Sequence, residues 1–388
     1  HRVLIRGLAP APEQRFPDMA ALLAALTRGR ARARLRLAAL GLAGLALAAL
    51  AVLAVGRIDR MQRLAACERA GASISEVWND DARARLHAAF LATGVAGADT
   101  TVAKLLPWLD RQAEAWRAAR TEVCHHADLA RDWDPATLDR ALWCLDDRRS
   151  DLAAQVRELA DADASAVHRA VPAVSRVTID GRCSDAAWLQ RQPSPPTRGR
   201  AELITTRAAL SRVESLHYAG KYADAVALAT TTRSRAEALA WPPILAAAWL
   251  AEGLALVADG AYPRAEAALA SAYYLAARED AWTTASDAAN ELIFLIGYKL
   301  ARPAEARAWF RHAEVAAVHA GDPTGLVAAR RLGELATALD LAGDYRESEA
   351  LYRQAITLDE RALGPDHPQL AVTLNNLGSL LLATGDYA

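Results

Sequence analysis

A short turn motif recurs at nearly constant spacing in the second half of the chain, and it limits the fold of that half more than any other feature. Its copies start at Gly220, Gly260, Ala301, Gly343 and Gly385, at intervals of 40, 41, 42 and 42 residues. In the glycine copies a tyrosine follows two residues later. Glycine suits this position because the residue that ends a helix often adopts a left-handed conformation. The third copy has Ala301 and Pro303 instead, so we expect a different turn there.

The residues after each turn repeat as well, and their spacing predicts a helix. Counted from the start of the turn, small residues stand five positions later. In three of the repeats, larger apolar residues stand nine positions later and alanines twelve positions later. The first set is Ala225, Ala265, Ala306 and Ser348; the second is Leu269, Phe310 and Tyr352; the third is Ala272, Ala313 and Ala355. These offsets place all three positions on one face of an α-helix. Because one hairpin cannot bury its apolar face alone, we expect residues 201–388 to stack as an α-solenoid of helical hairpins.

The last repeat carries a more specific pattern, Leu363-Gly364-Pro365-Asp366-His367-Pro368 followed by Thr373-Leu374-Asn375-Asn376-Leu377-Gly378. It resembles the long tetratricopeptide (TPR) repeats of the kinesin light chain type. In that family the first helices of the hairpins line a groove that binds peptide segments. The resemblance implies that Asn376 hydrogen-bonds a peptide backbone, with Arg330 and Glu334 near the same groove, and that the partner is a protein or peptide. His367 is expected to stabilise the turn between repeats rather than to act in catalysis.

Leu37–Gly56 is a stretch of 20 residues without a charged or polar side chain. As a helix it would be about 30 Å long, which matches the hydrocarbon core of a bilayer. A soluble core helix normally keeps one polar face. This stretch has none, so we expect a transmembrane helix over 37–56 rather than a buried core helix. Small residues at Ala39/Ala43 and Gly44/Ala48 would let two such helices approach closely, which would allow a homodimer.

Basic residues flank this span unevenly. The segment 28–36 holds five arginines, at positions 28, 30, 32, 34 and 36, whereas three, Arg57, Arg60 and Arg63, follow the span. The positive-inside rule therefore places the N-terminal side in the cytoplasm and the repeats outside it. We expect a single-pass protein of the plasma (inner) membrane, whose basic juxtamembrane segment 28–36 lies near the lipid headgroups of the bilayer.

All four cysteines, Cys67, Cys124, Cys144 and Cys183, follow the span. An even number on the outer side fits two disulfides in an oxidising compartment. Three pairings exist, and we favour Cys67–Cys124 with Cys144–Cys183. A zinc site fits less well, because no two cysteines have the short spacing of zinc ligands. Adjacent histidines on a helix point about 100° apart, so we expect no metal at His125-His126 either.

Residues 2–26 resemble the last segment of a bacterial Ser/Thr protein kinase domain. The match consists of Arg6-Gly7-Leu8, Pro12-x-x-Arg15-Phe16, Met19 and the stripe Leu22-Leu23-Leu26. In that family the arginine of this motif pairs with a buried glutamate that ends the activation segment. The resemblance assigns this structural role to Arg15, with its partner upstream of His1. An ordinary amphipathic helix with a proline-rich entry is the alternative interpretation.

The segment between the span and the repeats is predicted to be helical. Apolar residues have helical spacing over Asp81–Leu91 and Val102–Val123. Asp134 as N-cap and Pro135 at the first helical position open a helix that can run to Leu159. Six of the ten tryptophans lie in this region, 64–190, and we expect them to be buried between helices. Three prolines in Gln190–Arg200 predict a linker over 191–200.

The composition and the missing motifs narrow the classes of function that we expect. Lys+Arg (45) nearly equals Asp+Glu (46) in 388 residues, which gives no electrostatic reason to expect a nucleic-acid partner. The Gly-rich loop and the H-R-D and D-F-G motifs of a kinase core are absent from the sequence. We therefore expect no catalytic residue and no cofactor in residues 1–388, with ATP and Mg²⁺ serving only an intact kinase.

Two functions fit this organisation. The favoured one is the juxtamembrane, transmembrane and partner-binding part of a single-pass Ser/Thr kinase, in which residues 1–27 end the kinase domain. The alternative is a membrane-anchored TPR scaffold without catalytic activity. Both expect an all-α chain and a longer protein than residues 1–388.

Overall fold

The computed structural model describes residues 1–175, 181–322 and 324–385, except for the side chains of residues 29–32. All regular elements in these ranges are helical. The all-α fold predicted from the hydrophobic periodicity is therefore confirmed for the described residues. The side chains of Arg30 and Arg32, and Tyr387 of the last turn motif, lie outside the described part.

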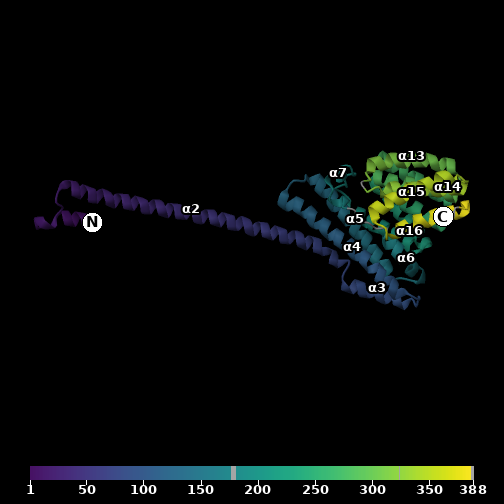
Figure 1. The fold of residues 1–388 in the computed structure, drawn as a ribbon, viewed down its shortest axis with the longest axis horizontal. Helices are drawn as coiled ribbons and strands as arrows, with labels where there is room; N and C mark the ends of the chain where they lie inside the picture. The colour runs from purple at the N-terminus through teal and green to yellow at the C-terminus, as the bar shows by residue number, and fades with distance from the viewer. Residues whose placement is uncertain (176–180, 323, 386–388) are drawn as a thin grey trace. The chain divides into compact units, whose positions relative to one another are not determined.

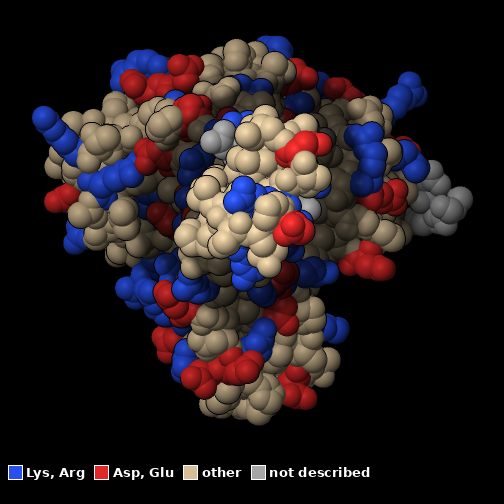
Figure 2. Space-filling model, turned by 90° about the vertical axis from the view of Figure 1, so that its left-hand side faces the viewer, with Lys and Arg blue, Asp and Glu red and all other residues tan. Residues whose placement is uncertain are grey.

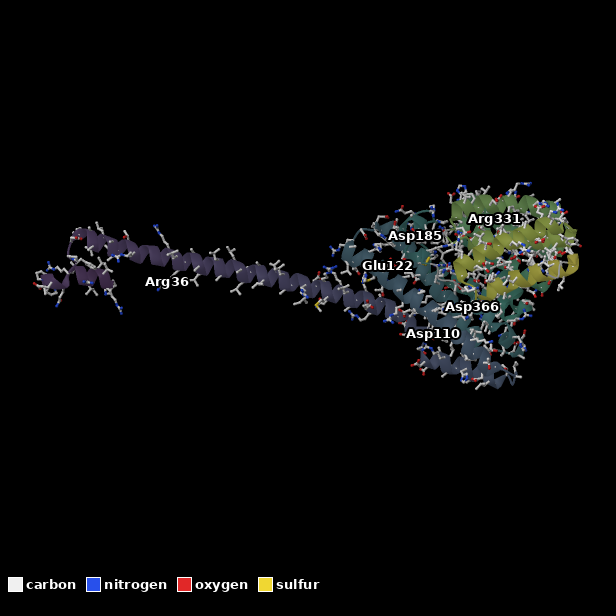
Figure 3. The ribbon with its side chains drawn as sticks, in the orientation of Figure 1. Arg36, Asp110, Glu122, Asp185, Arg331 and Asp366 are labelled. Carbon is white, nitrogen blue, oxygen red and sulfur yellow. A yellow bond between two sulfur atoms is a disulfide. The ribbon has the colours of Figure 1, made fainter. Side chains whose placement is uncertain are left out.

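The structure divides into two compact units, His1–Ala66 and Cys67–Ala388. The first unit holds the short helix α1 (Arg2–Gly7) and most of the long helix α2 (Met19–Ala72). The predicted span Leu37–Gly56 lies within α2, and each of its side chains is exposed. Figure 3 shows side chains projecting above and below α2 beyond Arg36.

The second unit begins with the predicted helical region. Its elements are α3 (Asp80–Ala92), α4 (Ala98–His125), α5 (Pro135–Leu159), α6 (Ala164–Ser175) and α7 (Ala186–Leu189). Helices α4 and α5 run side by side (Figure 1). The Asp134 carboxylate accepts hydrogen bonds from the N–H groups of Ala136 and Thr137, so the predicted N-cap of α5 is confirmed. Trp78, Trp116 and Trp188 are buried in the core, as expected, whereas Trp108, Trp133 and Trp143 are only half-buried.

The repeats follow as paired helices in two layers. The first helices of the pairs are α8 (Arg200–Ala219), α10 (Pro242–Asp259), α12 (Trp282–Phe294), α14 (Leu326–Ala342) and α16 (Pro368–Thr384). The second helices are α9 (Tyr222–Glu237), α11 (Tyr262–Arg278), α13 (Pro303–Ala320) and α15 (Tyr345–Leu363). Each first helix in the described chain contacts the next first helix, so these five form one layer, called here the inner layer.

The turns behave as the glycine pattern predicts. Gly220, Gly260, Gly343 and Gly385 have φ between 79° and 85°, in the left-handed region. The third turn differs, also as expected. There a π-helical turn (Leu295–Lys299) precedes Ala301, which takes the left-handed conformation with φ 52°.

The predicted linker 191–200 does not separate two domains, because the residues on both sides of it belong to the same unit. Arg140 of α5 donates hydrogen bonds to the Gln192 carbonyl (3.0 Å) and the Ser194 hydroxyl (2.6 Å). The segment is non-helical, as its prolines predict, but side chains of α5 hold it in place. The segment predicted as a linker is thus an anchored connection inside one unit.

Candidate partner-binding site

The N-terminal helices of the second unit pack against the inner layer of the solenoid. Helix α5 lies along α8, and α6 contacts both α8 and α16, the first and the last inner helices. The Trp108 ring of α4 meets the His367 ring edge-on, with centroids 5.0 Å apart. Part of the inner face, where a peptide groove was expected, is therefore covered by helices of the same chain.

Two cavities remain between these helices and the inner layer, with volumes of about 370 and 550 Å³. They share lining residues from α5, α8, α12 and α14, so they adjoin each other, and the two together are called here the central hollow. The shared residues include Arg148, Asp151, Ser211, Glu214, Asp287 and Arg330. Charged and hydroxyl side chains from segments far apart in the sequence thus face one interior space.

Arg330 of α14 is an ion-paired cation of the hollow. Its guanidinium lies 2.9 Å from the Glu291 carboxylate and 4.0 Å from the carboxylates of Asp287 and Glu334. Burial disfavours the charged form, but these carboxylates outweigh it and raise the pKa of Arg330 above its ordinary value. Arg330 is therefore held as a fixed positive charge.

The carboxylates of the hollow are less well compensated. Burial, and then the charge of Asp147, raise the pKa of Asp151 to about 6, although the Ser211 hydroxyl donates a hydrogen bond to it (2.7 Å). The Glu214 residue is exposed and lines both cavities. The surrounding protein and the nearby Asp151 nevertheless raise the pKa of Glu214. Burial raises the pKa of Asp287 as well.

Buried polar groups of α12 also face the hollow. Asn290 and Ser286 are 1% and 2% exposed, and both line the smaller cavity. Within the described residues, the amide oxygen and nitrogen of Asn290 and the Ser286 hydroxyl have no hydrogen-bond partner. Most buried polar side chains in proteins are hydrogen-bonded, so these groups are available to something that enters the hollow.

The structure separates the groove residues expected from the TPR resemblance. Arg330 and Glu334 line the smaller cavity, whereas Asn376 of α16 is half-buried and lines neither cavity. His367 caps α16, because its Nδ1 accepts a hydrogen bond from the Gln369 N–H (3.1 Å). That contact fits the turn-stabilising role expected for His367.

The sequence analysis did not single out the other groups of the hollow. A signal for them exists on α12, where Thr283, Ser286, Asp287 and Asn290 follow one another at helical spacing in an alanine-rich segment. A polar stripe of this kind on a helix that neighbours pack on both sides indicates an interior polar site.

The four cysteines form the two disulfides that we favour from the sequence. Cys67 is bonded to Cys124 and Cys144 to Cys183, with Cα–Cα distances of 5.3 and 5.5 Å. The first disulfide joins the end of α2 to α4, and the second joins α5 to the segment that leads to α7. Cys67 and Cys124 lie close to Asp128, but both sulfurs of this group are bonded to each other and offer no thiolate to a metal.

Arg15 is placed outside any helix of the first unit, on an exposed stretch of chain. Its Nε donates to the Ala9 carbonyl (2.7 Å), and a terminal nitrogen donates to the Pro10 carbonyl (3.3 Å). In the part of the chain that the structure describes, its hydrogen-bond partners are thus backbone carbonyls. A carboxylate partner remains an expectation of the kinase resemblance.

The comparison with known protein families gives a match within the repeats. A tetratricopeptide repeat model matches residues 332–388. The chain is therefore an all-helical protein with a TPR region, and TPR repeats in general bind protein partners. The match begins in α14 and does not reach the kinase-like residues 1–27. A search of curated proteins finds no match.

Two described helices are long and apolar enough to cross a membrane by length and composition. One is the apolar part of α2, which is entirely exposed, and the other is α10, which packs within the solenoid. The exposed helix near the N-terminus has the character of a membrane anchor or a signal sequence. Figure 2 shows acidic and basic side chains interspersed over the visible face.

Proposed function

We propose that this chain anchors a protein-binding TPR solenoid to a membrane and is the anchoring and partner-binding region of a single-pass Ser/Thr protein kinase. The observation that carries the membrane part is the exposure of Leu37–Gly56. An uncharged helix of this length leaves its whole apolar surface open to the surroundings. Such a surface is stable in lipid and costly in water.

The kinase part of the proposal rests on the resemblance of residues 2–26 and on their position just before the basic segment and the span. In this order a cytoplasmic enzyme, a membrane helix and an outer binding module would share one chain. Partner binding at the solenoid would alter how two spans associate, and so how two kinase domains meet. A TPR scaffold without a kinase is the second candidate, favoured by a family match that lies in the last repeats, at residues 332–388.

Membrane fractionation tests the anchor. The chain should remain in the membrane fraction after an alkaline wash without detergent. Leu45→Arg combined with Leu50→Arg should release it, because each arginine near the bilayer centre costs about 2.5–3.5 kcal/mol on insertion scales. Leu382→Arg, at a similarly exposed leucine of α16, is the matched control and should leave the distribution unchanged. Wild-type protein in the aqueous fraction would refute the anchor.

Phosphorylation tests the kinase part separately. The product of the whole gene, isolated from membranes, should transfer phosphate from ATP in the presence of Mg²⁺. A change in the upstream catalytic loop should abolish this transfer. An intact gene product that is membrane-bound but transfers no phosphate would favour the scaffold.

A further inference from the structure

We propose that the central hollow binds a small organic cation, a guanidinium or a primary ammonium group carried on a polar molecule. The site lies on the inner face where the resemblance places a peptide groove, but α5 of the preceding region forms one of its walls. Its smaller cavity, about 370 Å³, falls within the range of roughly 300–1,000 Å³ that small-molecule sites occupy.

The positive charge of the ligand follows from the carboxylates. Asp151, Glu214 and Asp287 face the hollow from α5, α8 and α12. Asp151 has Arg148 as an ion-pair partner at 3.6 Å, and Asp287 has Arg330 at 4.0 Å. Glu214 forms no ion pair with any residue that the structure describes; burial, and then the charge of Asp151, raise its pKa. A cation placed between these groups would relieve their mutual repulsion.

The hydrogen-bonding character of the ligand follows from α12. Asn290 offers an unpaired amide oxygen and an unpaired amide nitrogen at a position that is 1% exposed, and Ser286 adds a hydroxyl. A guanidinium or ammonium group donates several hydrogen bonds, which suits the Asn290 oxygen and the carboxylates together. An acceptor elsewhere on the ligand would satisfy the Asn290 nitrogen. These requirements describe a polar organic cation rather than an apolar molecule.

The spacing of the carboxylates argues against a metal ion. In the described part of the chain, the group Cys67, Cys124 and Asp128 is the one set of three such ligand atoms within 4.8 Å of one another. Asp151, Glu214 and Asp287 do not meet that spacing, so in this arrangement their carboxylates lie too far apart for one ion to contact all three. An extended cation with several donors can bridge carboxylates that one metal ion cannot.

Calorimetric titration of the detergent-solubilised chain with L-arginine and L-lysine tests this proposal. One of the two is expected to bind at a single site. L-citrulline, the uncharged counterpart of arginine, should bind at least tenfold more weakly. A blocked peptide with a central arginine identifies the source: binding of the peptide alone indicates a partner's basic side chain, and binding of the free amino acid alone indicates a metabolite. Ca²⁺ and Mg²⁺ should produce no binding heat.

Variants localise the site. Glu214→Gln should weaken binding at least tenfold, whereas Glu202→Gln, the same change at an exposed position of the same helix, should change it less than twofold. Ser286→Ala is the mild variant in case Glu214→Gln does not fold, and it should weaken binding severalfold while helical content stays constant. Absence of binding by every cationic probe, equal binding of citrulline, or binding unchanged by both hollow variants would overturn the proposal.

Discussion

The indole N–H of Trp188 donates a hydrogen bond to the backbone carbonyl of Ala320, 132 residues further along the chain, at 3.1 Å. Both residues are buried. This bond ties the end of the cysteine-bearing region to the end of α13 in the solenoid. Trp188 also lies five residues after Cys183, so the disulfide and the hydrogen bond hold neighbouring parts of the same segment.

Trp188→Phe should destabilise the second unit. The substitution keeps most of the apolar contact but leaves the Ala320 carbonyl without its partner, and an unsatisfied buried acceptor costs about 1–3 kcal/mol. Urea unfolding followed by circular dichroism measures the change in free energy. Trp282→Phe is the control, since the Trp282 N–H bonds only to the exposed Asp280 side chain two residues earlier. Equal decreases in the free energy of unfolding of the two variants would contradict a structural role for the long-range hydrogen bond.

Replacing both Cys144 and Cys183 with serine should lower the free energy of unfolding by about 2–5 kcal/mol, the usual effect of losing a native disulfide. The thermal midpoint of the wild type should fall on addition of reductant, and that of the double variant should fall less. Thiol labelling before and after reduction reports on the compartment. Four thiols that react without reduction in protein taken from membranes would remove the argument for an oxidising side.

Stability should fall as the pH rises from about 4 to about 6. Burial raises the pKa of Asp151 to about 6, so the folded state binds this proton more tightly than the unfolded state, whose carboxyl titrates near 4. Ionising Asp151 in this window therefore destabilises the fold, by on the order of 2 kcal/mol. Asp151→Asn should flatten the pH dependence and keep the contact with Ser211. A variant whose unfolding profile matches that of the wild type from pH 4 to 6 would refute this assignment.

Substituting alanine for each of two glycines in helical segments should change the stability of the protein in opposite directions. A Cβ on Gly297 would lie 2.3 Å from the Cβ of Ala338 and 3.0 Å from that of Ala306, and neither methyl group can rotate away. Gly297→Ala should therefore cost about 1–3 kcal/mol through overpacking. A Cβ on Gly378 would meet nothing within 4 Å. Gly378→Ala should stabilise α16 by up to about 1 kcal/mol, and thermal melts of both variants check the pair.

The sequence was most informative where local chemistry determines structure. The glycines at 220, 260 and 343 predict the turns because few residues tolerate positive φ, and Asp134-Pro135 predicts the start of α5 because both residues suit a helix N-terminus. The α-solenoid itself follows from the periodicity of small and apolar residues. The turn and N-cap signals act over one or two turns of helix, and the solenoid follows from the recurrence of such local patterns every 40 to 42 residues.

The placement of α5 and α6 on the inner layer could not be predicted in the same way. It depends on contacts such as Arg207 with Asp147 (2.6 Å) and Arg200 with Asp139 (2.6 Å), each about 60 residues apart. From the sequence alone, charged residues of this type are expected to lie at a solvated surface. The central hollow exists only through this packing, so Glu214 and Asn290 carried no recognisable signal as a pair.

The left-handed conformation of Ala301 indicates a substitution that would make the protein more stable. Alanine in that conformation costs roughly 1–2 kcal/mol, which the other repeat turns avoid with glycine. Ala301→Gly would remove this cost at a residue that lines neither cavity of the hollow.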